Sequence, residues 1–126
     1  MTDLKVLLPG PSHPITIEPS SSRVTVEHDG RVLADTRHAL TLRESTYPPV
    51  HYLPLADVSP GVLEPSSHTS WCPFKGKATY FDVVVGDRRV KDAVWTYRAP
   101  HKAVAEIADH VAFHAERLDS LVVHDD

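Results

Sequence analysis

The fold class is decided by residues 78–97, ATYFDVVVGDRRVKDAVWTY, because this stretch has the form of a β-hairpin. Its two arms, 78–85 and 89–97, are rich in the aromatic and β-branched residues that strands favour. Between the arms lies Gly86-Asp87, a pair typical of a tight turn. The stretch therefore predicts two antiparallel strands and a mainly β protein.

The N-terminal third predicts further strands. In residues 22–29, Val24 and Val26 alternate with polar neighbours, which is the period of a half-buried strand. Asp29-Gly30 then predicts a type I′ hairpin turn. We expect the next strands or extended segments at 31–36, 39–44 and 47–54.

Eleven prolines divide the chain into short pieces. Proline ends helices and is confined to strand starts or edges, so this distribution favours a β-rich fold with many loops. Residues 55–67 are predicted to form a loop with one short helical turn. The last fifteen residues predict a weak strand or a tail that ends in Asp125-Asp126.

One C-terminal helix is expected after Pro100, which suits a first helical turn. A helical face is formed by Val104, Ile107, Ala108 and Val111. His110 and His114 have the spacing of a metalloprotease helix, but no glutamate follows the first histidine directly. We therefore interpret both as exposed or partly packed histidines near the end of a helix.

The amino-acid composition limits the domain count, the partners and the location that we expect. The chain has 126 residues, and we expect a single domain over 1–126 with flexible ends. Its formal charge of −4 argues against nucleic-acid binding, which needs a basic surface. No segment approaches the roughly 20 apolar residues that cross a bilayer, and no basic leader is visible. We expect a cytoplasmic protein with no membrane partner.

Residues 68–80, HTSWCPFKGKATY, hold most of the reactive side chains. The only cysteine, Cys72, excludes an internal disulfide and the paired cysteines of a structural zinc site, so we expect no metal and no cofactor. Lys75 and His68 are close enough in sequence to favour a nucleophilic thiolate at Cys72. The alternative is a buried thiol that acts as a small hydrophobe. Lys75-Gly-Lys77 lacks the features of a phosphate-binding loop.

Polar and aromatic residues gather near the predicted strand ends and in the proline-rich segments. Such mixtures are typical of ligand pockets, which are apolar with a few convergent polar groups. In the alternative reading, Trp95 and Tyr97 simply pack the core. The candidate ligand-binding residues are Arg37, Glu44, Tyr47, Tyr52, His68, Thr69, Cys72, Lys75, Trp95 and Tyr97.

Four segments resemble the domain-of-unknown-function family 427, and together they span about residues 13–118. They are His13–Pro19, Val50–Val58, Leu63–Tyr80 and Ala93–Tyr97, of which the HTSWCPFKG run (68–76) is the most specific. The resemblance implies a β-tent, with two small antiparallel sheets joined at one end and splayed at the other, beside a helix. Relatives of that architecture hold zinc through two Cys-x-x-Cys pairs, so the implied tent is metal-free here.

Within that tent we expect residues 68–80 to be a cleft-lining loop. His68, Thr69, Cys72 and Lys75 would face inward. The family is sometimes filed under a nucleotidyltransferase-like label, but this sequence has no Gly-Ser followed by paired aspartates that would hold metal for such transfer.

Three function classes stay open. The first is a protein that binds an anionic or polar small molecule, with Lys75 and Arg37 meeting charge and Trp95 and Tyr97 offering flat faces. The second is an enzyme in which Cys72 is the nucleophile or His68 the general acid–base, oriented by Glu44. The third is a peptide- or protein-interaction module that uses the same cleft.

Overall fold

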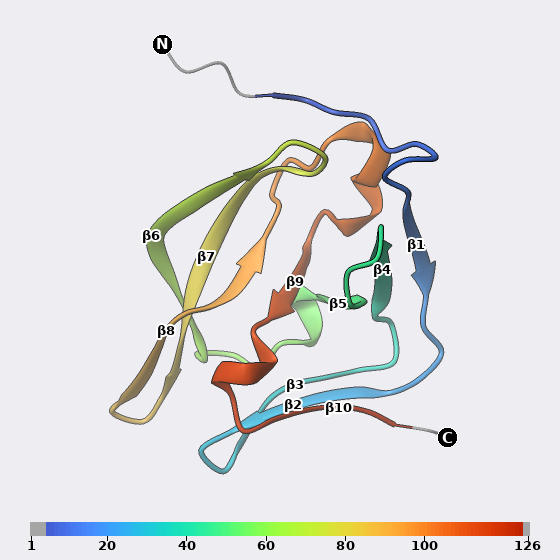
Figure 1. Cartoon of the computed structure of the whole chain (residues 1–126). Helices are drawn as coiled ribbons and strands as arrows, with labels where there is room; N and C mark the ends of the chain where they lie inside the picture. The colour runs from blue at the N-terminus through green and yellow to red at the C-terminus, as the bar shows by residue number, and fades with distance from the viewer. Residues whose placement is uncertain (1–4, 125–126) are drawn as a thin grey trace.

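The computed structural model describes residues 5–124, and these form ten strands and three 3₁₀ helices (Figure 1). The strands are β1 (Ile15–Pro19), β2 (Val24–His28), β3 (Arg31–Thr36), β4 (Leu40–Glu44), β5 (Val50–Pro54), β6 (Leu63–Cys72), β7 (Gly76–Val85), β8 (Arg88–Thr96), β9 (His110–Phe113) and β10 (Ser120–Val123). The 3₁₀ helices are η1 (Leu55–Asp57), η2 (Lys102–Ile107) and η3 (Ala115–Arg117). The prediction of a mainly β protein is confirmed, as is the hairpin of β7 and β8.

Seven strands form one antiparallel sheet in the order β1-β4-β5-β9-β8-β7-β6. The short strand β9 joins its two halves, because Leu53 of β5 pairs with Val111 and Trp95 of β8 pairs with Ala112. Figure 1 shows β6, β7 and β8 on one side of β9, with β1, β4 and β5 on the other. Side chains from strands far apart in sequence can therefore meet across β9.

The other sheet has the order β10-β2-β3. Its β2–β3 hairpin turns at Asp29 (φ 51°) and Gly30 (φ 79°), the paired positive φ values of the predicted type I′ turn. The two sheets share a hydrophobic core, whose buried members include Val24, Val26, Leu33, Leu53, Val83 and Val94. A second cluster lies between the larger sheet and η2 and contains Leu42, Tyr52, Ala78, Tyr97, Val104, Ile107 and Ala112.

The predicted C-terminal helix is wrong. Lys102–Ile107 form the 3₁₀ helix η2, which is interrupted by non-helical backbone at Val104 (φ −127°, ψ 29°). Asp109 has a φ of 62°, and the chain then enters β9. Val104 and Ile107 are both fully buried, but a spacing of three residues fits a 3₁₀ helix as well as an α-helix. The pairing of β9 with β5 and β8 favours a strand over the predicted helix. This pairing cannot be recognised from the helical periodicity of the sequence.

The predicted loop over 55–67 is correct only in its first part. The expected short helical turn is η1, but strand β6 already begins at Leu63. β6 is an edge strand with mostly exposed, polar side chains and an irregular register between Pro65 and Thr69. It therefore lacks the alternation of apolar and polar residues by which a strand is recognised in a sequence.

The 68–80 segment is consequently a hairpin and not a cleft-lining loop. Its first five residues end β6, residues 73–75 make the turn, and β7 begins at Gly76. At the two ends of the chain, the predicted flexibility falls in part on residues 1–4 and 125–126, which lie outside the described residues. Between residues 5 and 124 there is no helix long and apolar enough to cross a membrane.

Candidate functional site

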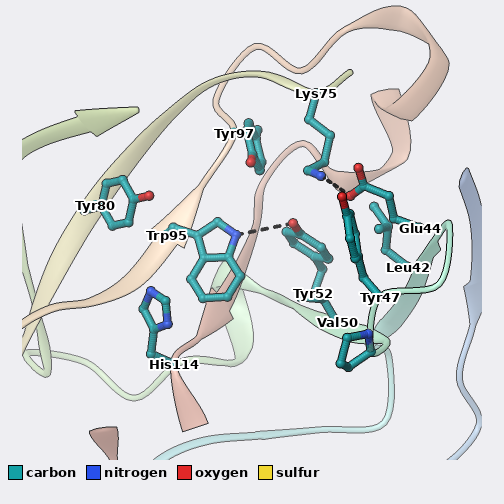
Figure 2. Close-up of a pocket in the computed structure, with 11 residues that line it drawn as sticks. Leu42, Glu44, Tyr47, Val50, Tyr52, Lys75, Tyr80, Trp95, Tyr97 and His114 are labelled. Carbon is teal, nitrogen blue, oxygen red and sulfur yellow. Dashed lines mark hydrogen bonds and ion pairs between the residues drawn. The ribbon is translucent and has the colours of Figure 1, made fainter. Parts of the chain in front are cut away.

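A cavity of about 250 Å³ lies between the two halves of the seven-stranded sheet (Figure 2). β4, β5 and the segment between them form one side, while β7 and β8 form the other. Lys75 reaches in from the β6–β7 turn, and His114 follows β9. The lining residues are Leu42, Glu44, Tyr47, Pro48, Val50, Tyr52, Lys75, Tyr80, Trp95, Tyr97 and His114.

The backbone around Lys75 is held on both sides. Its N–H donates to the Cys72 carbonyl at 3.2 Å, and its carbonyl accepts from the N–H of His101 at 2.9 Å. The next residue, Gly76, has a φ of 111°, and a Cβ there would lie 3.2 Å from the His101 ring. The turn therefore requires glycine at this position and aims the buried Lys75 side chain at the cavity.

Glu44 connects Lys75 to a histidine outside the cavity lining. Lys75 Nζ donates to Glu44 Oε1 at 2.5 Å, and His13 Nε2 lies 2.7 Å from Glu44 Oε2. The His13 ring stacks on Phe74 with centroids 4.0 Å apart. Burial raises the pKa of Glu44, but the hydrogen bonds from Lys75 and His13 outweigh it and hold the pKa below its ordinary 4.5. Glu44 is thus an ionised carboxylate shared by two partners.

Aromatic side chains form the walls. Trp95 Nε1 donates to the Tyr52 hydroxyl at 3.3 Å, which ties β8 to β5 across the cavity. Burial raises the pKa of Tyr52 to about 12, and burial likewise raises the pKa of Tyr97. Both phenols therefore stay protonated at neutral pH. Lys75 Nζ lies 6.0 Å from the Tyr97 ring centroid, at the outer limit of a cation–π contact.

Unused hydrogen-bonding groups converge in this space. Glu44 accounts for one of the three N–H donors that a lysine ammonium carries, and it is the partner found for Lys75 among residues 5–124. The same described residues provide no hydrogen bond to the Tyr97 hydroxyl. The cavity therefore offers donors from Lys75 and Tyr97 beside flat aromatic faces, a combination suited to a planar molecule with an acceptor group.

The structure brings together six of the ten candidate residues. Glu44, Tyr47, Tyr52, Lys75, Trp95 and Tyr97 all line the cavity. The other four lie elsewhere. Arg37 is exposed between β3 and β4, and Cys72 is half-buried against the second core cluster. His68 and Thr69 are exposed on β6, where the His68 ring packs on Tyr80 at 4.5 Å.

Sequence reasoning missed five lining residues, namely Leu42, Pro48, Val50, Tyr80 and His114. A signal existed for Tyr80, because it pairs with Trp95 in the correctly predicted hairpin. A signal also existed for Leu42, which lies two residues before Glu44 on one face of β4. His114 had none, because the strand before it was predicted to be a helix.

No three His, Cys, Asp or Glu side chains converge to hold a metal ion in the part of the chain that the structure describes. Among known proteins, a family model described as a domain of unknown function (DUF427) matches residues 16–124. No curated protein matches the chain.

Proposed function

Because the chain belongs to the DUF427 family, whose description assigns no activity, we propose its function from the site: it binds a small planar molecule with an anionic or polar acceptor group. The cavity between the two halves of the larger sheet is the binding site. Lys75 and Tyr97 would supply the hydrogen bonds, and Trp95 the flat face.

The Lys75–Glu44 pair carries this proposal. The two side chains are only 10% and 12% exposed, so both charges are largely removed from water. That removal costs several kcal/mol per ion, and well-packed apolar residues often stabilise a fold as well or better. Stability is therefore a weak reason for a charged pair here. An ammonium with two unused donors in the lining of an open cavity has a direct use in binding an acceptor.

The charges of Lys75 and Glu44 also restrict the charge that a bound ligand can carry. A carboxylate or carbonyl would gain charge-assisted hydrogen bonds from Lys75. It would share that ammonium with the ionised Glu44, whose negative charge repels a second anion at close range. A singly charged or neutral acceptor fits better than a multiply charged phosphate.

Catalysis by Cys72 or His68 has less support. Neither side chain lines the cavity, and Glu44 contacts His13 instead of His68. His68 packs on the ring of Tyr80 from the exposed strand β6.

We also propose the architecture, location and partners that the family resemblance and the composition imply. The two antiparallel sheets would be those of a β-tent without zinc, supported by the single cysteine. We further propose one domain, a cytoplasmic location and no nucleic-acid partner, supported by the composition and the acidic net charge.

A tryptophan-fluorescence titration tests the binding. Trp71 donates to the Lys5 carbonyl outside the cavity, so Trp71→Phe leaves Trp95 as a single reporter in the cavity wall. Benzoate, nicotinamide, uracil and inorganic phosphate are titrated into this protein. We expect saturable quenching or enhancement with at least one of the three planar probes and none with phosphate.

The matched comparison is Lys75→Met with Lys77→Met, both in the Trp71→Phe background. Lys77 is exposed and lies two residues away, outside the cavity lining. We expect Lys75→Met to weaken binding of the responding probe at least tenfold and Lys77→Met to leave it within twofold. Equal affinity in the two variants, or no response to any planar probe, would refute the proposal.

A further inference from the structure

A second cavity of about 370 Å³ adjoins the first. The two share four lining residues, Pro48, Val50, Trp95 and His114. The His114 ring packs on Trp95 with centroids 4.5 Å apart, and its Nδ1 lies 3.1 Å from Glu116 Oε1. Figure 2 shows His114 and Trp95 together at the edge of the first cavity. The boundary between the cavities is therefore made of these shared side chains.

The second cavity differs from the first in chemistry. Six of its lining residues are apolar: Pro48, Pro49, Val50, Phe113, Ala115 and Leu121. Of its polar members, Glu116 is exposed and turns toward His114. His51 is half-buried, and burial lowers its pKa, with a smaller contribution from the nearby positive charge of Arg43. His51 is thus neutral at pH 7, and the second cavity presents mainly an apolar surface.

Size supports a ligand that occupies both spaces. Cavities that bind small molecules run from roughly 300 to 1,000 Å³. The first cavity, at about 250 Å³, falls below this range by itself, whereas the second, at about 370 Å³, falls within it, so a ligand held at Lys75 gains volume by extending into the second cavity.

We propose that the two cavities form one groove for an amphiphilic ligand, with a planar acceptor-bearing head at Lys75 and an apolar tail along Pro49, Phe113 and Leu121. This inference rests on the proposed function and adds the ligand class to it. The head binds through Lys75 and Tyr97, and the shared side chains Trp95 and His114 lie where the head meets the tail. A planar aromatic carboxylate with an alkyl substituent opposite the carboxylate is the simplest molecule of this class.

The test measures affinity as a function of tail length. Benzoate, 4-butylbenzoate and 4-hexylbenzoate are titrated into the Trp71→Phe protein below their micelle-forming concentrations. Each buried methylene contributes about 0.8 kcal/mol, so we expect affinity to rise about threefold to fourfold per methylene over the first few carbons.

The location of the tail is tested with Ala115→Glu, which adds a carboxylate to the lining of the second cavity beside the exposed Glu116. Ala115 is exposed and does not line the first cavity, so the variant spares the core and the head-group site. Ala103→Glu is the control, because Ala103 is also an exposed alanine in a 3₁₀ helix but lines neither cavity. We expect Ala115→Glu to lower the ratio of 4-hexylbenzoate to benzoate affinity at least tenfold and Ala103→Glu to leave that ratio unchanged.

The outcomes separate the two proposals. Benzoate binding that depends on Lys75 but gains nothing from a longer tail would overturn the groove and leave the head-group site standing. A gain with tail length that survives Ala115→Glu would also overturn it. A protein that binds none of the three carboxylates would contradict the groove, and its failure to bind nicotinamide and uracil as well would contradict the binding function itself.

Discussion

At Glu44 the two carboxylate oxygens take different partners, since Lys75 donates to one and His13 lies against the other. Lys75 in turn is fixed by its own backbone hydrogen bonds to Cys72 and His101. The position of the ammonium in the cavity therefore depends on residues from the segment before β1, from β4 and from the β6–β7 turn. Single substitutions separate what this pair does for stability from what it does for binding.

Lys75→Met should lower the free energy of unfolding by about 1–3 kcal/mol, because it leaves the half-buried Glu44 carboxylate without its cationic partner. Lys77→Met, at an exposed position, should change it by no more than about 0.5 kcal/mol. Urea unfolding of both variants measures the difference. Glu44→Leu combined with Lys75→Met should recover part of the loss, since an apolar pair carries no desolvation cost. A double variant less stable than Lys75→Met would contradict this account.

Glu44 should also make stability depend on pH in acid. Its pKa in the folded protein lies below the ordinary 4.5, so the unfolded chain binds a proton more readily than the folded one. The contribution is fully present above pH 4.5 and is lost as the pH falls through the lower folded pKa. The stability difference between the parent and Glu44→Gln should therefore be larger at pH 6 than at pH 3 in urea unfolding. A constant difference across that interval would show that the carboxylate has no net stabilising partner.

At the scale of elements, the β6–β7 hairpin positions the lysine. Cys72 and Gly76 pair across the end of the hairpin, and the three residues between them form the turn. The turn also contacts the segment before η2 through His101. The geometry of this turn thus sets both the position of the lysine in the cavity and the packing of the η2 segment against the hairpin.

Gly76→Ala should destabilise the protein by at least about 2 kcal/mol, because alanine is strained at a φ of 111° and its Cβ would crowd the His101 ring. Gly86→Ala is the control. Gly86 also has a positive φ, of 60°, but nothing lies within 4 Å of a Cβ there, so about 1 kcal/mol is expected. Thermal and urea unfolding compare the two. Equal losses would mean that His101 gives way and the turn does not depend on it.

At the scale of the whole molecule, β9 makes one sheet out of two sets of strands. Its pairing with β5 and β8 sets the distance between Tyr52 and Trp95, whose hydrogen bond spans the cavity. The smaller sheet packs against this arrangement through the shared core that includes Val26 and Leu53. The cavity is a product of the sheet topology, since no single strand or hairpin encloses it.

The whole protein should fold without zinc. Its one cysteine cannot supply the thiolate pairs that hold the metal in relatives of the β-tent architecture. Untagged protein refolded with and without a chelator should regain the same Tm and contain far less than one zinc per chain by elemental analysis. One zinc per chain, or loss of folding in chelator, would contradict the prediction.

Elements with local sequence signals could be predicted before the structure was known. The type I′ turn at Asp29-Gly30 and the β7–β8 hairpin follow from turn chemistry and from β-branched and aromatic content, so both were predicted correctly. The candidate residues Glu44, Lys75 and Trp95 also stood out, because charged and aromatic groups near strand ends are visible without coordinates.

The remaining features depend on contacts between segments that are far apart in the sequence. Strand β9 replaced an expected helix because its hydrogen-bond partners, β5 and β8, lie outside its own segment. The exposed edge strand β6 has no buried face, so it lacks the alternation that marks a strand in a sequence. Likewise, His13 reaches Glu44 across 31 positions of the chain. The local sequence determines which conformations a segment favours. Pairing between distant strands determines which of these conformations forms and brings together the residues that line the cavity.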